Sequence, residues 1–218
     1  MIPRILVINP NSNDGVTRVI DRSLQSCRAQ AVLDVSCMTL ADAPFSIETD
    51  EDIDAVKPLI VKAILSHGDA DAFVIACYAD PGLEESRSQS NKAVFGIQES
   101  AVSLSVTYGR RFGVLALGRD AIHRHIAYVR QLGCQDFHAG ERPLDISVDA
   151  TVNDPDVLMK IIETGRQLID EDGAETLILG CAGLSGHRKA AQHELGVPVI
   201  DPVEAAVTMA MESLGLNV

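Results

Sequence analysis

Two cysteines occupy matching positions in two similar segments of the chain. Cys77 follows the apolar run 72–76, Cys181 follows the apolar run 176–180, and small, turn-prone residues come after each. The two positions are 104 residues apart in a chain of 218. Thiols at equivalent places of a duplicated unit can face one site from opposite sides. This arrangement suits the removal of a proton from one face of a carbon atom and its return to the other face.

The similarity extends beyond the cysteines. Ile97 lies 20 residues after Cys77, Ile200 lies 19 residues after Cys181, and the segment 4–8 has a counterpart in 111–115. Several segments that repeat in the same order at one offset indicate an internal duplication. We therefore predict two lobes of ordinary small-domain size, the first formed by residues 1–97 plus 203–218 and the second by residues 98–202.

Short apolar runs alternate with segments of helical period along the chain. The predicted strands cover residues 5–8, 32–36, 72–76, 93–97, 112–116, 176–180 and 197–200, and the predicted helices cover 14–29, 51–66, 84–91, 98–109, 120–132, 155–171, 186–195 and 202–214. Near-continuous apolar character favours parallel strands that are covered on both faces. The fold class is therefore α/β, with two pseudosymmetric doubly wound lobes and the active site in the cleft between them.

Composition limits the partners. The net charge is −13 with no basic cluster, so nucleic acid is disfavoured. No apolar run approaches the roughly 20 residues that span a bilayer, and no signal peptide is recognisable at the start. The five cysteines are then expected to be free thiols in a reducing compartment, the cytoplasm. The expected partner is a small-molecule substrate, and association into a homo-oligomer stays open.

Motifs for common cofactors are missing from the sequence. Neither Cys-x-x-Cys nor His-Glu-x-x-His occurs, so a metal site has little support. A Gly-x-Gly-x-x-Gly after the first strand and a Walker phosphate loop are also missing, which disfavours nicotinamide, flavin and ATP. His123 and His125 are two residues apart on a predicted helix and point to different faces. The prediction is an activity without a cofactor.

The residues around the two cysteines suggest how a site is built. A helix that starts after each cysteine would lower the thiol pKa toward neutrality. Asn9 follows the first strand, where its amide is available to a polar substrate atom, while Asn11 or Ser12 is expected to cap the next helix. Asp80 is interpreted as a cap at the start of the helix near residue 84, with a catalytic carboxylate as the alternative.

Segments 7–12, 75–83, 179–184 and 197–201 resemble the Asp/Glu/hydantoin racemase superfamily, and within it the hydantoin and allantoin racemase branch. The resemblance covers essentially the whole chain. It implies racemisation by two cysteines without a cofactor, in a cleft between two pseudosymmetric lobes. Cys77 would be the base for one enantiomer and Cys181 the acid, with the roles exchanged for the other enantiomer. Asn9 matches the asparagine of the family that contacts substrate.

The resemblance also implies a way to stabilise the enolate. Backbone N–H groups of Tyr78, Ala79, Ala182 and Gly183 would bind its oxygen, as in an oxyanion hole. Two departures concern the substrate. Many relatives carry a hydroxyl pair after the first strand of the second lobe, where this chain has the segment 114–118, Val-Leu-Ala-Leu-Gly. The residue after the first cysteine is often Phe, and here it is Tyr78.

Three functions remain open at this point. The first is a racemase of a hydantoin- or allantoin-like cyclic ureide, or of a related amino acid derivative. The second is a decarboxylase or cis–trans isomerase of a malonate- or maleate-like diacid. The third is a non-catalytic protein that binds a small ligand, in which neither thiol is unusually reactive.

Overall fold

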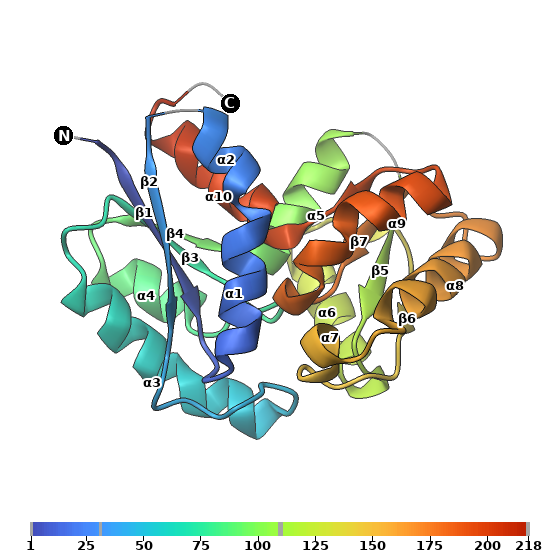
Figure 1. Ribbon diagram of the computed structural model, residues 1–218, viewed down its shortest axis with the longest axis horizontal. Helices are drawn as coiled ribbons and strands as arrows, with labels where there is room; N and C mark the ends of the chain where they lie inside the picture. Colours follow the sequence, from blue (N-terminus) through green and yellow to red (C-terminus); the bar gives the residue numbers. More distant parts are fainter. Residues whose placement is uncertain (1, 31, 109–110, 217–218) are drawn as a thin grey trace.

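Two four-stranded parallel sheets form the framework of the protein, one in each lobe (Figure 1). The computed structural model describes residues 2–30, 32–108 and 111–216. The sheet orders are β2-β1-β3-β4 and β6-β5-β7-β8, so the second sheet repeats the order of the first. The strands are β1 (Arg4–Asn9), β2 (Asp34–Thr39), β3 (Ala72–Ile75), β4 (Ala93–Gly96), β5 (Phe112–Ala116), β6 (His138–Pro143), β7 (Thr176–Leu179) and β8 (Val199–Ile200). The predicted α/β class with two doubly wound lobes is confirmed.

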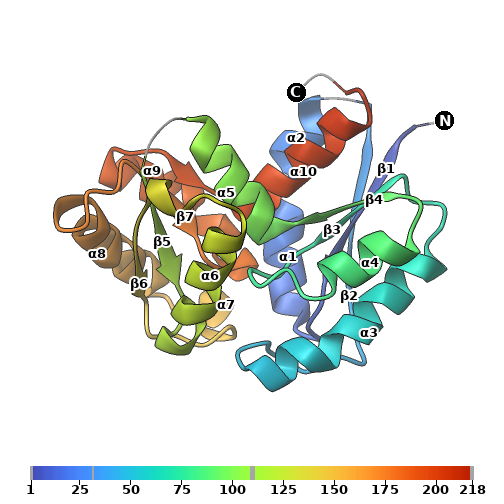
Figure 2. The same cartoon turned by 180° about the vertical axis from the view of Figure 1, so that it is seen from behind.

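Helices connect the strands and cover both faces of each sheet (Figures 1 and 2). In the first half of the chain they are α1 (Asp14–Ser23), α2 (Gln25–Gln30), α3 (Asp50–Ser66), α4 (Leu83–Gln89) and α5 (Ile97–Thr107). In the second half they are α6 (Arg119–Gln131), the short 3₁₀ turn η1 (Gln135–Phe137), α7 (Ala150–Asn153), α8 (Val157–Asp170), the 3₁₀ segment η2 (Ala182–His187), α9 (Arg188–Leu195) and α10 (Pro202–Ser213).

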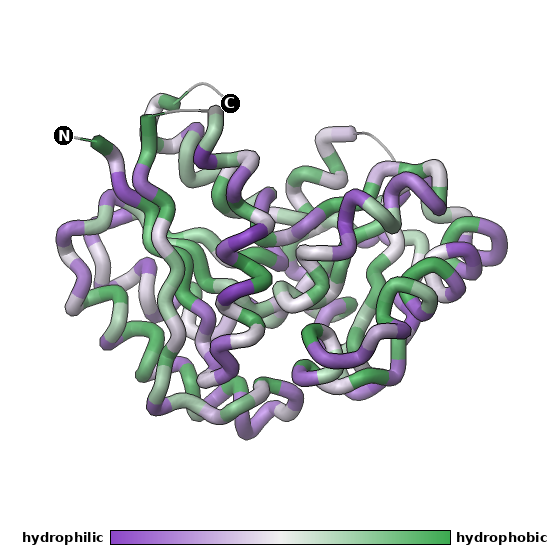
Figure 3. The backbone as a smooth tube through the Cα atoms, in the orientation of Figure 1, coloured by the Kyte–Doolittle hydropathy of each residue, from purple (hydrophilic) through white to green (hydrophobic). Residues whose placement is uncertain are grey.

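The strands are apolar on both sides because both faces of each sheet are buried. In β1, Ile5 and Val7 point into the core between the lobes, whereas Leu6 and Ile8 point into the core beneath α3. Successive side chains of a strand alternate between the faces, so a continuous apolar run fills two cores. Figure 3 shows the apolar stretches along the central strands and the polar stretches on the outward sides of the helices.

Two helices join the lobes. The last helix, α10, packs against β1, β3 and β4 of the first sheet, although it follows β8 of the second. The helix α5 leaves β4 of the first sheet and contacts both α10 and β7. Residues from both sheets and both helices, among them Val74, Ile178, Ala101 and Val207, belong to one continuous core. The predicted boundaries at 97/98 and 202/203 stay a prediction, and residues 1, 31, 109–110 and 217–218 of those ranges lie outside the described residues.

Several predicted elements differ from the structure. The predicted helix 14–29 is divided into α1 and α2, and the predicted helix 155–171 begins only at Val157, with Asp156 as its N-cap. The first two residues of the predicted helix 186–195 belong to the 3₁₀ segment η2, and the α-helix begins at Arg188. The end of the predicted helix 98–109 lies outside the described residues. The strand β6 was not predicted, because its sequence His-Ala-Gly-Glu-Arg-Pro has no apolar run. Pro58 lies within α3 without dividing it.

The N-cap of the first helix, α1, lies one or two residues later than expected. Asn13 is the N-cap of α1, and its side chain accepts a hydrogen bond from the Gly15 N–H at 2.9 Å. Asn11, one of the two expected caps, instead accepts the Asn13 N–H at 2.9 Å. The start of α10 lies at the first residue of the predicted helix 202–214, with Asp201 as the N-cap and Pro202 in the first turn. None of the helices among the described residues has both the length and the apolar character needed to cross a membrane.

Candidate functional site

A cavity of about 240 Å³ lies where the two lobes meet, beyond the carboxyl ends of β3 and β7. Cys77 lines it from the first lobe and Cys181 from the second. Both side chains are partly exposed, and both are free thiols. The duplicated loops therefore bring the two sulfur atoms to one site, as the sequence pattern predicts for parallel sheets.

Burial dominates the acidity of Cys77. Loss of solvent, with a smaller contribution from the charge of Cys181, raises the pKa of its thiol to about 12. The Ala79 N–H, which hydrogen-bonds the sulfur, lowers the pKa by a smaller amount. The loop is held by a turn in which the Asp80 N–H donates to the Cys77 carbonyl oxygen at 3.0 Å.

Cys181 stands at the start of η2 and is its N-cap. Its sulfur accepts the Gly183 N–H at 3.4 Å. Burial raises the pKa of this thiol to about 11, while the N–H groups of Gly183 and Leu184 lower it. The backbone therefore acts in the direction expected from the sequence, but the expected thiol pKa near neutrality is wrong, because the cost of burying a thiolate is larger.

The residues next to the cysteines divide into two groups. Tyr78, Ala79 and Ala182 line the cavity. Gly183 is buried behind it, where an added Cβ atom would lie 2.1 Å from Thr151 Oγ1. The structure thus gives a packing reason for a glycine at position 183, besides its N–H group on the sulfur.

Asn9 lies beneath the cavity wall and is fully buried. Its Nδ2 is within hydrogen-bond distance of Asn11 Oδ1 at 2.9 Å and Thr17 Oγ1 at 3.0 Å, and its Oδ1 accepts the Asn11 N–H at 3.3 Å. The asparagine that lines the cavity is Asn11. In this structure Asn9 orders the first loop, and its predicted contact with substrate stays a prediction.

Charged residues that the sequence analysis missed close the cavity. Arg124 on α6 pairs with Asp50 at the start of α3, with 3.0 Å between Nη1 and Oδ1, and its Nη2 donates to the Glu48 carbonyl oxygen at 3.3 Å. Glu48 Oε1 accepts the Val148 N–H at 2.9 Å. These bonds join the lobes across the cavity. They come from a loop and a helix face that only tertiary packing brings together.

A buried acid–imidazole pair forms another part of the wall. His125 lines the cavity, and its Nδ1 is hydrogen-bonded to Oε1 of Glu141, whose side chain is fully buried. The ring of Tyr78 meets the His125 ring edge-on, with 5.0 Å between centroids. His125 therefore has Nε2 as its remaining polar atom for a ligand. The expectation that His123 and His125 point apart fits this arrangement, but the sequence did not indicate that His125 faces the site.

The rest of the wall is mostly apolar. Side chains of Ile47, Ile53, Ile146 and Val148 contribute to it, together with Leu117 from the segment where many relatives carry hydroxyl groups. Within the described residues no group of three His, Cys, Asp or Glu side chains is arranged to hold a metal ion. The cavity thus combines two thiols and a few polar groups with an apolar surface, as is usual for small-molecule sites.

Comparison with known proteins gives a consistent result. A family model for Asp/Glu/Hydantoin racemase matches residues 5–210. The hydantoin racemase of Paenarthrobacter aurescens is 35% identical over 220 residues, covering 98% of this chain and 92% of that protein. The hydantoin racemase of Rhizobium meliloti is 36% identical over 219 residues, covering 97% and 88%.

The solved structure of allantoin racemase from Klebsiella pneumoniae is similar to this structure with a TM-score of 0.89 and 28% sequence identity, covering 98% of this chain and 89% of that one. The family model and the relatives extend over nearly the whole chain, and the structural similarity includes both lobes. The chain therefore belongs to the Asp/Glu/hydantoin racemase family, and it is an isomerase of the racemase type.

Proposed function

We propose that this protein interconverts the enantiomers of a 5-substituted hydantoin or a similar cyclic ureide, with Cys77 and Cys181 as the two proton-transfer groups and no cofactor. The observation that carries this proposal is that the two thiols line one cavity from opposite lobes. The volume of about 240 Å³ is below the roughly 300–1,000 Å³ of sites for drug-sized ligands, and it suits a small ring. The hydantoin and allantoin racemases among its relatives support a ureide as the substrate.

In the proposed reaction one cysteine removes a proton from the substrate and the other cysteine returns one, so no further reactant is needed. The thiolate of one cysteine takes the proton from the ring carbon that bears the substituent, and the electron pair of that bond moves into the neighbouring carbonyl to form an enolate. The thiol of the other cysteine then returns a proton to the opposite face. Because the N–H groups of Ala79 and Gly183 point at the sulfur atoms, those of Tyr78 and Ala182 are the proposed donors to the enolate oxygen.

Charge in the cavity favours a neutral ring over a diacid. Among the described residues that line the cavity, Glu48 and Asp120 carry carboxylates and Arg124 is the one Lys or Arg side chain. Arg124 is already paired with Asp50. A malonate- or maleate-like dianion would therefore enter a site with no spare cation, at a cost in desolvation that a neutral ureide avoids.

The apolar wall supports an aliphatic or aromatic substituent on the ring. A ureido group, which is the substituent of allantoin, finds no hydrogen bond where it lies against Ile47, Ile53 and Ile146. Its partners in this cavity are limited to polar residues such as Asn11, Thr49 and His125. A polar group left without partners in a dry site costs about 1–3 kcal/mol. We therefore place 5-alkyl and 5-arylalkyl hydantoins ahead of allantoin.

Deuterium exchange tests the proposal. Each candidate, namely allantoin, several 5-substituted hydantoins, aspartate, glutamate and malonate-type acids, is incubated with enzyme in D₂O and followed by NMR and polarimetry, with the rate without enzyme subtracted. Wild type is compared with Cys77→Ser and Cys181→Ser. Cys134→Ser is the matched control, because Cys134 is a free thiol outside the cavity.

The expected result is deuteration of a hydantoin with loss of optical rotation, abolished in both site variants and kept in the control. Release of carbon dioxide or alkene isomerisation from a diacid, without ureide exchange, would replace the proposal with the second function. No exchange with any ureide would count against it. Thiol alkylation at neutral pH does not separate an enzyme from a binding protein here, because burial raises the pKa of both thiols.

A further inference from the structure

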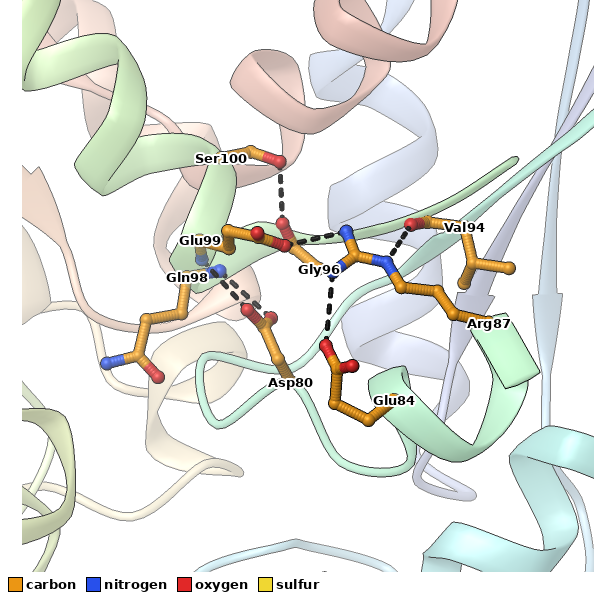
Figure 4. Close-up of polar contacts among 8 residues, drawn as sticks. All are labelled: Asp80, Glu84, Arg87, Val94, Gly96, Gln98, Glu99 and Ser100. Atoms are coloured by element: carbon orange, nitrogen blue, oxygen red, sulfur yellow. Dashed lines mark hydrogen bonds and ion pairs between the residues drawn. The ribbon is translucent and has the colours of Figure 1, made fainter. Parts of the chain in front are cut away.

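Asp80 is buried behind Cys77 and bonds to a helix that is not its own. Its Oδ1 accepts the Gln98 N–H at 3.0 Å and its Oδ2 accepts the Glu99 N–H at 2.8 Å, both in the first turn of α5 (Figure 4). The residue is 7% exposed. The expected capping of the helix near residue 84 is wrong, since Gly82 is the N-cap of α4. Asp80 instead ties the loop of Cys77 to α5.

The backbone at Asp80 is held in an unusual conformation. Its φ of 44° lies in the left-handed region, which non-glycine residues adopt at a cost of about 1 kcal/mol or more. Opposite it stands Gly96, where an added Cβ atom would lie 2.2 Å from Asp80 Cγ. The strained turn and the missing side chain at position 96 together let the carboxylate reach the α5 amides.

A second network surrounds the first. Arg87 donates to the Val94 carbonyl oxygen at 3.0 Å and pairs with Glu99 Oε2 at 2.7 Å and with Glu84 Oε1 at 3.2 Å (Figure 4). Arg87 therefore joins α4, β4 and α5 around the carboxylate of Asp80. The loop of Cys77 is fixed on a rigid support and is not a free surface loop.

The second lobe carries an equivalent connection. Ser185, four residues after Cys181, donates its hydroxyl to Asp201 Oδ1 at 2.9 Å. The same oxygen of Asp201 accepts the Val203 N–H at 2.8 Å and so caps α10. Asp201 is 2% exposed. In the first lobe the carboxylate lies on the cysteine loop, and in the second it lies on the helix, but each links one cysteine loop to one crossing helix.

We propose that Asp80 and the Ser185–Asp201 pair are the positioning residues of the two thiols, each holding one cysteine loop against the N-terminus of a helix that joins the lobes. This inference rests on the proposed function, because it takes the two thiols to be the proton-transfer groups. The links fix each sulfur relative to the other lobe, since α5 contacts β7 and α10 contacts β3 and β4. A misplacement of about 1 Å in a reacting group can slow catalysis by about a hundredfold.

The test uses Asp80→Asn and Ser185→Ala in the full-length protein. The asparagine tolerates a left-handed φ and keeps one acceptor, so it removes one of the two links to α5 and the charge. The alanine removes only the hydroxyl bond to Asp201. Asp145→Asn is the matched control, because Asp145 also has a left-handed φ, of 52°, but pairs with Arg119 on the surface.

Two quantities are measured, the rate of alkylation of each cysteine by iodoacetamide, followed by peptide mapping, and the rate of racemisation. In Asp80→Asn we expect Cys77 to react severalfold faster, Cys181 to react as in wild type, and racemisation to fall about ten- to hundredfold. In Ser185→Ala we expect Cys181 to react severalfold faster, Cys77 to react as in wild type, and racemisation to fall by a similar factor. The control matches wild type in both measurements.

Equal changes at both cysteines, or no change at either, in variants that keep the wild-type circular dichroism spectrum would overturn the inference. Ser185→Ala decides the question if Asp80→Asn does not fold. The alkylation pattern needs no substrate, so it remains informative if no ureide is turned over. In that case the proposed reaction fails, while a selective change at Cys181 in Ser185→Ala still supports the positioning role, because that variant alters no charge, whereas loss of the Asp80 charge by itself makes Cys77 more acidic.

Discussion

The buried carboxyl of Asp80 should make the protein less stable as pH rises. Burial raises its pKa from the ordinary value of 3.8 to about 7, whereas the N–H groups of Glu99 and Gln98 lower the pKa. The same value of the pKa includes a smaller increase from the charge of Glu99 and a decrease from that of Arg87. At 1.36 kcal/mol for each unit, the cost of holding the ionised group in the fold is about 4 kcal/mol.

The direction of this change in stability follows from which state of the protein binds the Asp80 proton. Between about pH 4 and pH 7 the folded protein binds the Asp80 proton and the unfolded chain does not, so stability falls with rising pH across this window. Below this pH window Asp80 is protonated in both the folded and the unfolded state. Above the window Asp80 is ionised in both states, and the full cost of burying the charge lowers the stability. Cys77, Tyr78 and Tyr128 sense the charge of Asp80, but their own pKa values are raised and they stay protonated throughout.

Asp80→Asn removes this titration. Urea unfolding of wild type and variant would be compared from about pH 5 to pH 8, above the sequence pI of about 4.7. The hydrogen bond lost in the variant lowers its free energy of unfolding by the same amount at every pH. The informative quantity is therefore how the difference between variant and wild type changes with pH. The stability of the variant relative to wild type should rise by about 2–3 kcal/mol across this range. A difference that does not change with pH would mean that the α5 amides offset burial fully and that Asp80 does not destabilise the fold at neutral pH.

Three further predictions concern the site. The rate of alkylation of Cys77 and Cys181 should rise about tenfold for each pH unit between about pH 7 and pH 10, because burial raises both pKa values; a plateau near neutral pH would contradict this. Gly183→Ala should cost about 1–3 kcal/mol of stability by overpacking against Thr151. Thr151→Ala in the same chain should restore part of it, and strictly additive losses in urea unfolding would argue against the contact. Glu141→Gln should lower stability by about 1–3 kcal/mol, because the amide keeps an acceptor for His125 but puts an N–H₂ group at the buried Oε2 position, which has no hydrogen-bond partner among the described residues, and an unchanged unfolding midpoint would contradict this.

The sheets and the cysteine pair were predictable because their signals are local. Both faces of each sheet are buried, so central strands such as β3 and β7 read as continuous apolar runs. The cysteines end such runs, and parallel strands place their carboxyl ends on one edge. Among the described strands, the edge strand β6 pairs with β5 alone, and its residues are only partly buried although the carboxyl of Glu141 is enclosed, so its sequence carries no such run.

The charged and polar part of the site was not predictable, because it depends on contacts between distant segments. Glu48 and Arg124 meet only when the lobes pack, and neither sits in a motif. For Asp80 the sequence indicates a capping residue but not which helix it caps, since a left-handed turn redirects the side chain to α5. The acidity of Cys77 was misjudged for a similar reason: the nearby N–H groups can be inferred from local sequence, whereas burial cannot.

The position of α10 has a consequence for the order in which the chain folds. Val203, Val207 and Met211 of this helix are fully buried in the same core as Ile5 and Val74 of the first sheet. During synthesis the strands of the first lobe emerge early, but α10, which covers that side of their sheet together with α1, is made only after β8. The first lobe can therefore complete its core only after the strands of the second lobe have been made, and truncation before α10 would damage the N-terminal half of the protein more than the half next to the cut.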